Sequence, residues 1–193
     1  MELAPADVDR YVAAYRAEEP LYPVEQESIE SLPDAFRAGE YGPRDAEWVV
    51  RWYFRRDQSA YPHEERREIE ERFADVDMGK VKAAIADAIE AIDGSSGDPD
   101  EPAAHEGALA ALTRLPAVDV RVGSAFLTFI NPDMYVPIGA REWTAVRQLT
   151  SLEGPYPDAP SIEEYGRYLA AVRDLRNRLD RDTRSIYMTI WRF

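Results

Sequence analysis

Apolar residues recur along most of this chain at the three- and four-residue spacing of an α-helix. One ridge, typical of an amphipathic helix, holds Val81, Ile85, Ala88, Ile89 and Ile92. The same periodicity predicts helices over about residues 7–18, 25–38, 64–73, 103–114, 120–130, 140–150 and 162–179, a helix that begins at Pro43, and a short helix at the C-terminal end. The alternation of apolar and polar residues that is typical of a strand is almost absent. The pattern therefore predicts an all-α fold.

Local signals predict where several of these helices begin and end. Ser161 and Glu164 have the spacing of a capping box at the start of the helix over 162–179. Pro33 should end or kink the helix over 25–38. The run 93–102, DGSSGDPDEP, is too rich in Gly, Ser, Asp and Pro to pack, so we expect a hinge there. At 193 residues the chain suits one helical domain, with possible subdomains at 1–93 and 103–193.

The chain is strongly acidic, and the acids are unevenly distributed. It has 37 acidic and 23 basic residues, and its only lysines are Lys80 and Lys82. Such a surface is typical of adaptation to high intracellular salt. Residues 1–110 carry a net charge of −15, whereas residues 111–193 carry +1. The neutral C-terminal part permits contact with a phosphate backbone, and deeper burial of this part is the alternative explanation.

The sequence lacks the residues that several kinds of chemistry need. It has no cysteine, which excludes disulfides, a thiol nucleophile and a cysteine-held iron–sulfur cluster. His63 and His105 are the only histidines, and neither lies in a zinc-binding motif. We expect neither a metal nor a cofactor.

Two features bear on where the protein works. No apolar run approaches the ~18 residues of a membrane-spanning helix, and the acidic N-terminal sequence does not have the features of a signal peptide. We therefore expect a cytoplasmic protein with no membrane partner.

Residues 115–143, LPAVDVRVGSAFLTFINPDMYVPIGAREW, have a distinctive order. A Leu-Pro-x-Val start leads through small residues into an apolar helix, and Val-Pro-Ile follows a loop. Over residues 109–149 the chain resembles the helix-hairpin-helix DNA glycosylases of the endonuclease III type. The resemblance implies a helical glycosylase-like fold, with a helix-hairpin-helix near 109–130 and a cleft between two helical subdomains. A weaker resemblance at the C-terminus puts Tyr187 where relatives carry an acid.

The chain departs from the family's motif at the functional positions. Ala117 and Asp119, on either side of Val118, replace hairpin glycines whose N–H groups approach a DNA phosphate. Arg121 replaces the lysine that forms a Schiff base in some members, and an arginine is not an amine nucleophile. Gly139 stands at the position of the catalytic aspartate. The resemblance thus implies a DNA-contacting segment made of Ala117, Val118, Asp119 and Arg121, and a catalytic site without its usual residues.

Other side chains near Gly139 are candidates for the missing roles. Asp133 and Glu142 flank the vacated position and are candidate substitutes for the aspartate. Arg141 and Trp143 are candidates for lining a pocket, because base-flipping enzymes stack the extruded base on aromatic groups. A place for Trp143 in the core is the alternative.

Two classes of function agree with these observations. The first is a divergent glycosylase-like protein that binds DNA weakly and is inactive by the usual mechanism. The second is a non-enzymatic all-α scaffold or protein-interaction domain that retained the fold and lost DNA binding. The fold itself does not decide between them.

Overall fold

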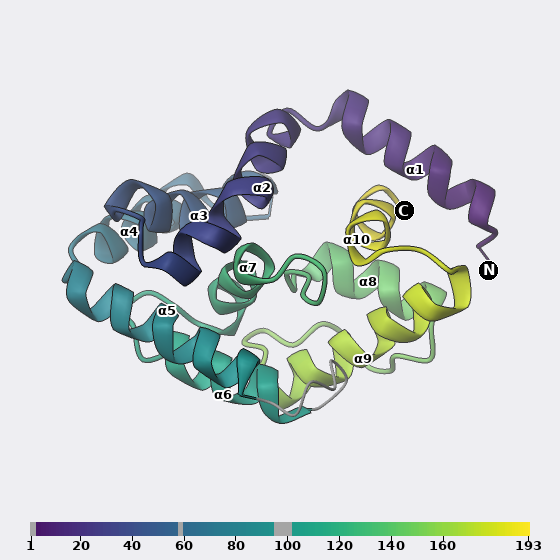
Figure 1. The fold of residues 1–193 in the computed structure, drawn as a ribbon. Coiled ribbons are helices and arrows are strands. Elements are labelled where there is room, and N and C mark those ends of the chain that lie inside the picture. Colours follow the sequence, from purple (N-terminus) through teal and green to yellow (C-terminus); the bar gives the residue numbers. More distant parts are fainter. Residues whose placement is uncertain (1–2, 58–59, 95–101) are drawn as a thin grey trace.

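The computed structural model describes residues 3–57, 60–94 and 102–193, with no account of the side chains of 102 and 103. These residues form ten α-helices and no strand, which confirms the predicted all-α fold (Figure 1). The first five helices are α1 (Pro5–Glu18), α2 (Tyr22–Ala38), α3 (Pro43–Arg55), α4 (His63–Ala74) and α5 (Met78–Asp93). The others are α6 (Pro102–Leu112), α7 (Val120–Ile130), α8 (Ala140–Leu149), α9 (Ile162–Leu179) and α10 (Thr183–Arg192). Within the described ranges no helix is long and apolar enough to cross a membrane.

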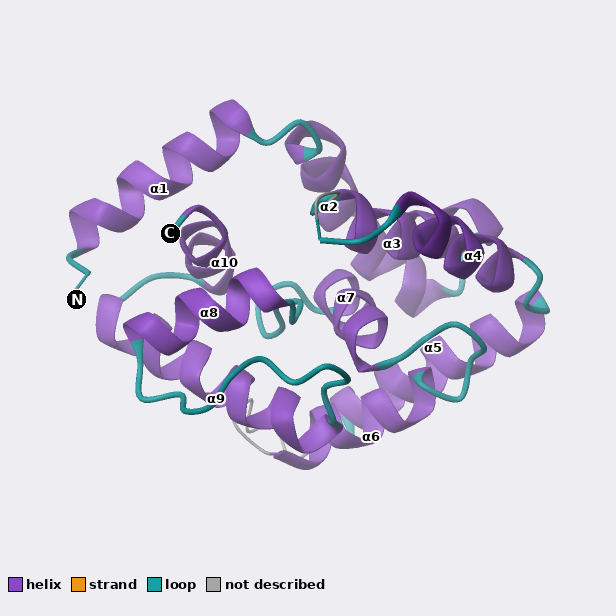
Figure 2. Cartoon of the chain, turned by 180° about the vertical axis from the view of Figure 1, so that it is seen from behind, coloured by secondary structure: helices purple, strands orange, loops and turns teal. Residues whose placement is uncertain are grey.

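The helices pack around two central ones, α7 and α10 (Figures 1 and 2). Every residue of α7 except Arg121 is buried, and α2, α3 and α6 pack against this helix. Helix α10 packs against α1, α8 and α9, so the first helix of the chain lies on the last one. This grouping differs from the predicted subdomains 1–93 and 103–193. Helix α1 packs with the C-terminal helices, whereas α6 and α7 pack with helices of the N-terminal part.

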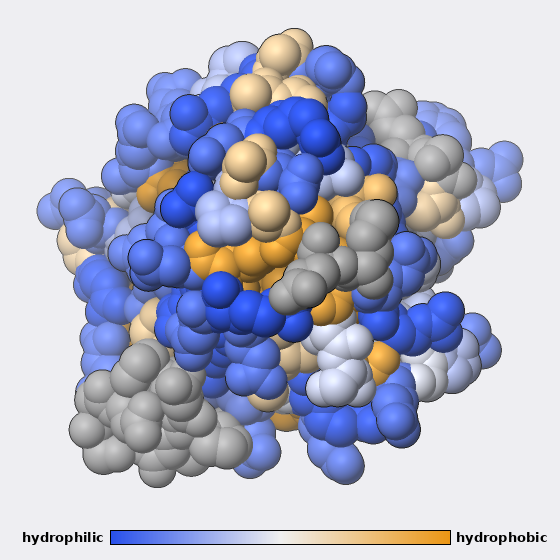
Figure 3. Space-filling view, turned by 90° about the vertical axis from the view of Figure 1, so that its right-hand side faces the viewer, coloured by the Kyte–Doolittle hydropathy of each residue, from blue (hydrophilic) through white to orange (hydrophobic). Residues whose placement is uncertain are grey.

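Charged and polar residues cover most of the face in Figure 3, and apolar residues show between them. Among the described residues Val24 is the one large apolar side chain that is exposed. Helix α4 follows this pattern closely, since Phe73 is its only buried residue. It is a charged, solvent-facing helix.

Of the two effects predicted for Pro33, an end or a kink of its helix, the end does not occur. Helix α2 continues through Pro33 to Ala38. A proline inside a helix removes one backbone hydrogen bond. Here Ile29, Leu32 and Phe36 are buried on the side of α2 that faces the core, and their packing offsets that loss. The predicted hinge at 93–102 lies mostly outside the described residues.

A tight connection joins α6 to α7. The N–H of Leu115 donates to the carbonyl of Leu112 at 3.0 Å, and the N–H of Val118 donates to that of Leu115 at 3.2 Å. Ala117 has φ of +65°, in the left-handed region that favours glycine. A Cβ added to Gly123 would lie 2.9 Å from Leu109 Cδ2, so a side chain at this position would require Leu109 to shift.

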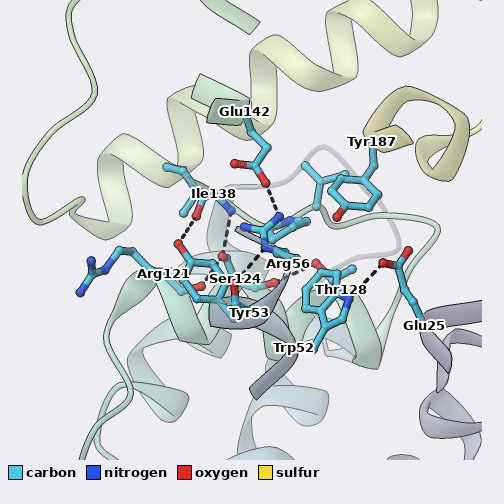
Figure 4. A network of polar contacts seen from close by, with 12 residues as sticks. Glu25, Trp52, Tyr53, Arg56, Arg121, Ser124, Thr128, Ile138, Glu142 and Tyr187 are labelled. Carbon is cyan, nitrogen blue, oxygen red and sulfur yellow. Dashed lines mark hydrogen bonds and ion pairs between the residues drawn. The ribbon is translucent and has the colours of Figure 1, made fainter. Parts of the chain in front are cut away.

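The connection from α7 to α8 passes through the interior in an extended form, and residues 135–139 are buried. Buried backbone groups need hydrogen-bond partners, and here side chains supply them. The hydroxyls of Tyr165, Tyr168 and Tyr53 donate to the carbonyls of Val136, Pro137 and Ile138 at 3.1, 3.1 and 2.7 Å. The N–H of Ile138 donates to Ser124 Oγ at 3.0 Å (Figure 4). Three helices therefore fix the segment that ends at Gly139.

Candidate functional site

The carboxylate of Glu142 fills the space beside Gly139. Gly139 is the residue before α8, and Glu142 lies in the first turn of that helix. A Cβ built on Gly139 would overlap Glu142 Oε2 and lie 3.4 Å from Arg56 Nη2. Gly139 has φ of −155°, an ordinary extended conformation. The space, and not the backbone, therefore keeps a side chain from position 139.

Arg56 pairs with Glu142 inside the protein (Figure 4). The side chain of Arg56 is 5% exposed and that of Glu142 is 2% exposed. Burial alone would lower the pKa of Arg56, but the Glu142 carboxylate and nearby phenol groups hold that pKa well above its usual range. Arg56 therefore stays charged, with the carboxylate of Glu142 as its counterion.

Aromatic rings surround the guanidinium of Arg56. Its central carbon lies 5.1 Å from the ring centre of Trp52, 4.7 Å from that of Tyr53 and 5.2 Å from that of Trp191. These distances are typical of cation–π contacts. The rings replace water around the cation, so the ion pair lies in an apolar setting where its attraction is strong.

A second buried carboxylate, Glu25, lies beyond Trp52. Its Oε2 accepts from Tyr15 Oη at 2.7 Å and from Trp52 Nε1 at 3.0 Å, and its Oε1 accepts from Arg184 at 3.1 Å. The hydroxyls of Tyr15 and Tyr187 lie 3.3 Å apart. Burial raises the pKa of both tyrosines, so both are neutral phenols. The network joins α1 and α10 to α2 and α3, across the two groups of helices.

The residues of the α6–α7 connection satisfy one another. Asp119 caps α7 by accepting from the N–H of Val122 at 3.0 Å, and it also accepts from Arg121 Nε at 2.7 Å. Burial would lower the pKa of Arg121, yet Asp119 holds that pKa above its usual range. The guanidinium of Arg121 lies 5.7 Å from the ring centre of Tyr61. Asp119 thus puts a carboxylate of the chain itself at the N-terminus of α7, where an external anion would bind.

Two other candidate residues, Asp133 and Arg141, lie at the surface. Asp133 is exposed, and its carbonyl accepts a hydrogen bond from Thr183. Arg141 is exposed and lies 4.3 Å from the ring centre of Trp191, whose ring Arg56 also contacts. Glu142 is therefore the candidate acid that the structure brings to Gly139.

Trp143 lies in the core. Its side chain is almost fully buried, its Nε1 donates to the carbonyl of Gly154 at 3.1 Å, and its ring stacks on Tyr168 with 6.2 Å between ring centres. This is the position that the alternative explanation of Trp143 expects.

The two histidines lie in different surroundings, His63 exposed and His105 buried. The described part of the chain contains no group of three His, Cys, Asp or Glu side chains that could hold a metal ion.

No sequence motif distinguishes Arg56, Glu25 or Tyr15 as a site residue. Arg56 follows an aromatic helix face and is one of 23 basic residues, so only its partner distinguishes it. Glu142 was a candidate because it flanks Gly139, the position at which the resemblance places the missing aspartate.

Comparison of the chain with models of protein families, with curated proteins and with solved structures finds no match.

Proposed function

We propose that this chain is a non-catalytic relative of the helix-hairpin-helix DNA glycosylases, which keeps their helical fold and contacts DNA weakly. The observation that carries the proposal is the buried pair of Arg56 and Glu142 beside Gly139. In the family this position supplies a carboxylate to a reaction that develops positive charge on the sugar. A carboxylate that is 2% exposed and already neutralised by a guanidinium has little charge left to stabilise that transition state.

The α6–α7 connection supports the same proposal. Ala117 keeps a left-handed backbone at a position where the family has glycine. Asp119 occupies the N-terminus of α7 and binds Arg121. A hairpin that kept its backbone course and gained an internal anion should bind a DNA phosphate weakly, because the two anions repel.

A base-release assay tests the absence of catalysis. Duplexes that carry uracil, an alkylated base or an oxidised base are incubated with the wild-type protein, and free base and strand breaks are measured. We expect no base release, and no covalent adduct after borohydride, since Arg121 cannot form a Schiff base. Asp133→Asn is the control for an exposed acid outside the pair.

A second candidate function is monofunctional base excision with Glu142 as a displaced acid. The observation that favours it is the overlap of Glu142 Oε2 with the Cβ position of residue 139. Excision by the wild type that Glu142→Gln abolishes and Asp133→Asn leaves intact would establish this candidate. Excision that survives the loss of both acids would contradict both functions.

A further inference from the structure

We infer that a cavity between α3 and α4 binds a phosphate-type oxyanion. Its volume is about 230 Å³. The residues that line it are Arg55, His63, Arg66, Arg67 and Glu70. Pockets for drug-sized ligands start at about 300 Å³, so this cavity suits a small ion or a single group of a larger ligand. The inference does not depend on the proposed function.

The lining residues of α4 belong to one face of that helix. His63, Arg66, Arg67 and Glu70 follow the spacing i, i+3, i+4 and i+7, which puts them on one side of a helix. Helix α4 packs against α3, and the last residue of α3, Arg55, completes the cavity. A helix normally turns an apolar stripe toward its neighbour. Helix α4 does so with Ile69 and Phe73, and the charged residues beside them line the cavity.

The one acidic side chain in this cavity is already shared by two other cations. Glu70 lies 3.1 Å from Arg55 Nη2 and 3.8 Å from Arg51 Nε. Arg67 pairs with Glu71 at 3.0 Å, but this pair is 64% and 67% exposed, and exposed pairs contribute little to stability. Arg67 is thus able to exchange Glu71 for a better anion at small cost.

Arg66 carries a polar atom without a partner. Its Nε is buried and makes no hydrogen bond among the described residues. Arg55 and Arg67 have carboxylate partners, whereas Arg66 has no ion pair among the described residues. An oxyanion in the cavity would meet the accessible part of the Arg66 guanidinium, and not its buried Nε, and would supply the missing counter-charge. Guanidinium groups match the oxygens of phosphate in geometry and can bind two oxygens at once, which favours phosphate over chloride.

NMR titration of the full chain tests the site. Sodium phosphate is added at constant ionic strength, with sodium chloride as the reference, and the Nε–H signals of arginines and the backbone amides are followed. We expect saturable changes at Arg66 and His63 with phosphate. Arg66→Gln should weaken phosphate binding about tenfold or more, because a charged hydrogen bond is lost. Arg72→Gln, on the same helix but outside this cavity, should leave binding unchanged.

A variant with the opposite effect keeps the test independent of any loss of folding. Glu70→Gln removes the one carboxylate of the cavity and should strengthen phosphate binding. Changes that chloride reproduces, or an equal loss in Arg66→Gln and Arg72→Gln, would overturn the inference.

Competition assigns the source of the phosphate. A thymidine oligonucleotide with a 5′-phosphate and the same oligonucleotide without it are titrated against bound phosphate. Displacement by the first alone supports a phosphate end of a nucleic acid, and displacement by neither supports free phosphate.

Discussion

The carboxylate of Glu142 fills the space that a side chain of residue 139 would need. The side chain of Glu142 folds back from the first turn of α8, and its Oε2 would overlap a Cβ of residue 139. A side chain at 139 and the present conformation of Glu142 therefore exclude each other. This relationship makes a prediction that the resemblance to glycosylases does not make.

Gly139→Asp should destabilise the protein, because the new side chain overlaps Glu142 and adds a second carboxylate beside Arg56. Overpacking of a filled interior costs about 1–3 kcal/mol. In the background of Glu142→Ala the same substitution should stabilise, since the space is empty and the new carboxylate can pair with Arg56. Urea unfolding of the four proteins measures both effects.

A loss of stability of equal size in both backgrounds would contradict this overlap. The double variant also has a carboxylate at the residue where the proposed resemblance places the aspartate of the glycosylases. Base release by this variant and by no single variant would support the proposed ancestry of the site.

The pair of Arg56 and Glu142 should be strongly coupled in stability. Glu142→Gln leaves a buried guanidinium without a counterion, and breaking a buried pair in this way costs about 3–5 kcal/mol. Arg56→Met leaves the carboxylate unpaired and should cost a similar amount. The double variant should lose much less than the sum of the two, as measured by urea unfolding. Additive losses would mean that the pair is not a unit.

The helices were predictable from sequence because their signals are local. The capping box of Ser161 and Glu164 forms as its spacing indicates, and α7 spans 120–130 as its apolar run predicts. Glu142 was a candidate because it lies close in the sequence to Gly139, where the resemblance places the missing aspartate. Arg56 could not be found in this way. Its partner is 86 residues away in the sequence, and their contact depends on how α3 meets α8.

Pro33 is a residue whose local signal predicted too large an effect on its helix. Its local effect is to remove one hydrogen bond from a helix, and the sequence alone gives no measure of the packing that opposes it. The burial of Ile29, Leu32 and Phe36 depends on the position of other helices. These contacts between helices, which the local sequence does not reveal, keep α2 helical beyond Pro33.

Ala117→Gly should stabilise the protein by about 1 kcal/mol, because glycine relieves the strain of a left-handed backbone. Ala13→Gly is the matched control. Ala13 is exposed on α1, where the same exchange should destabilise by roughly 0.5–1 kcal/mol. Thermal and urea unfolding of both variants measure the change in the free energy of unfolding, which should be a gain in the first variant and a loss in the second. A loss of stability in Ala117→Gly would mean that the connection does not need this backbone conformation.

Asp119→Asn should strengthen binding to duplex DNA without a loss of stability. Asparagine caps a helix about as well as aspartate, while the charge that repels a phosphate is removed. One unit charge at about 4 Å is worth ~1 kcal/mol in water, or roughly fivefold in affinity. The gain should shrink as salt rises. Fluorescence anisotropy at low and high salt measures it.

Asp34→Asn is the control for this experiment, since it makes the same charge change at an exposed position on α2. Equal gains in the two variants would show a general charge effect and not a hairpin site. No binding by any variant at any salt would favour the alternative of a scaffold that lost DNA contact.

His105 should make the protein less stable in mild acid. Its side chain is 4% exposed, and burial together with the nearby Arg173 lowers its pKa below the usual 6.5, with Glu106 opposing. The unfolded chain therefore binds a proton at a higher pH than the folded protein does. Stability is fully present above about pH 6.5 and falls as the pH decreases toward the lower pKa of the folded state.

In His105→Leu the free energy of unfolding should fall less between pH 7.5 and about 5.5, whereas His63→Gln, at an exposed site, should behave as the wild type. Because carboxylates titrate in all three proteins, the difference between the curves isolates His105, and identical curves would mean that its proton affinity does not change on folding.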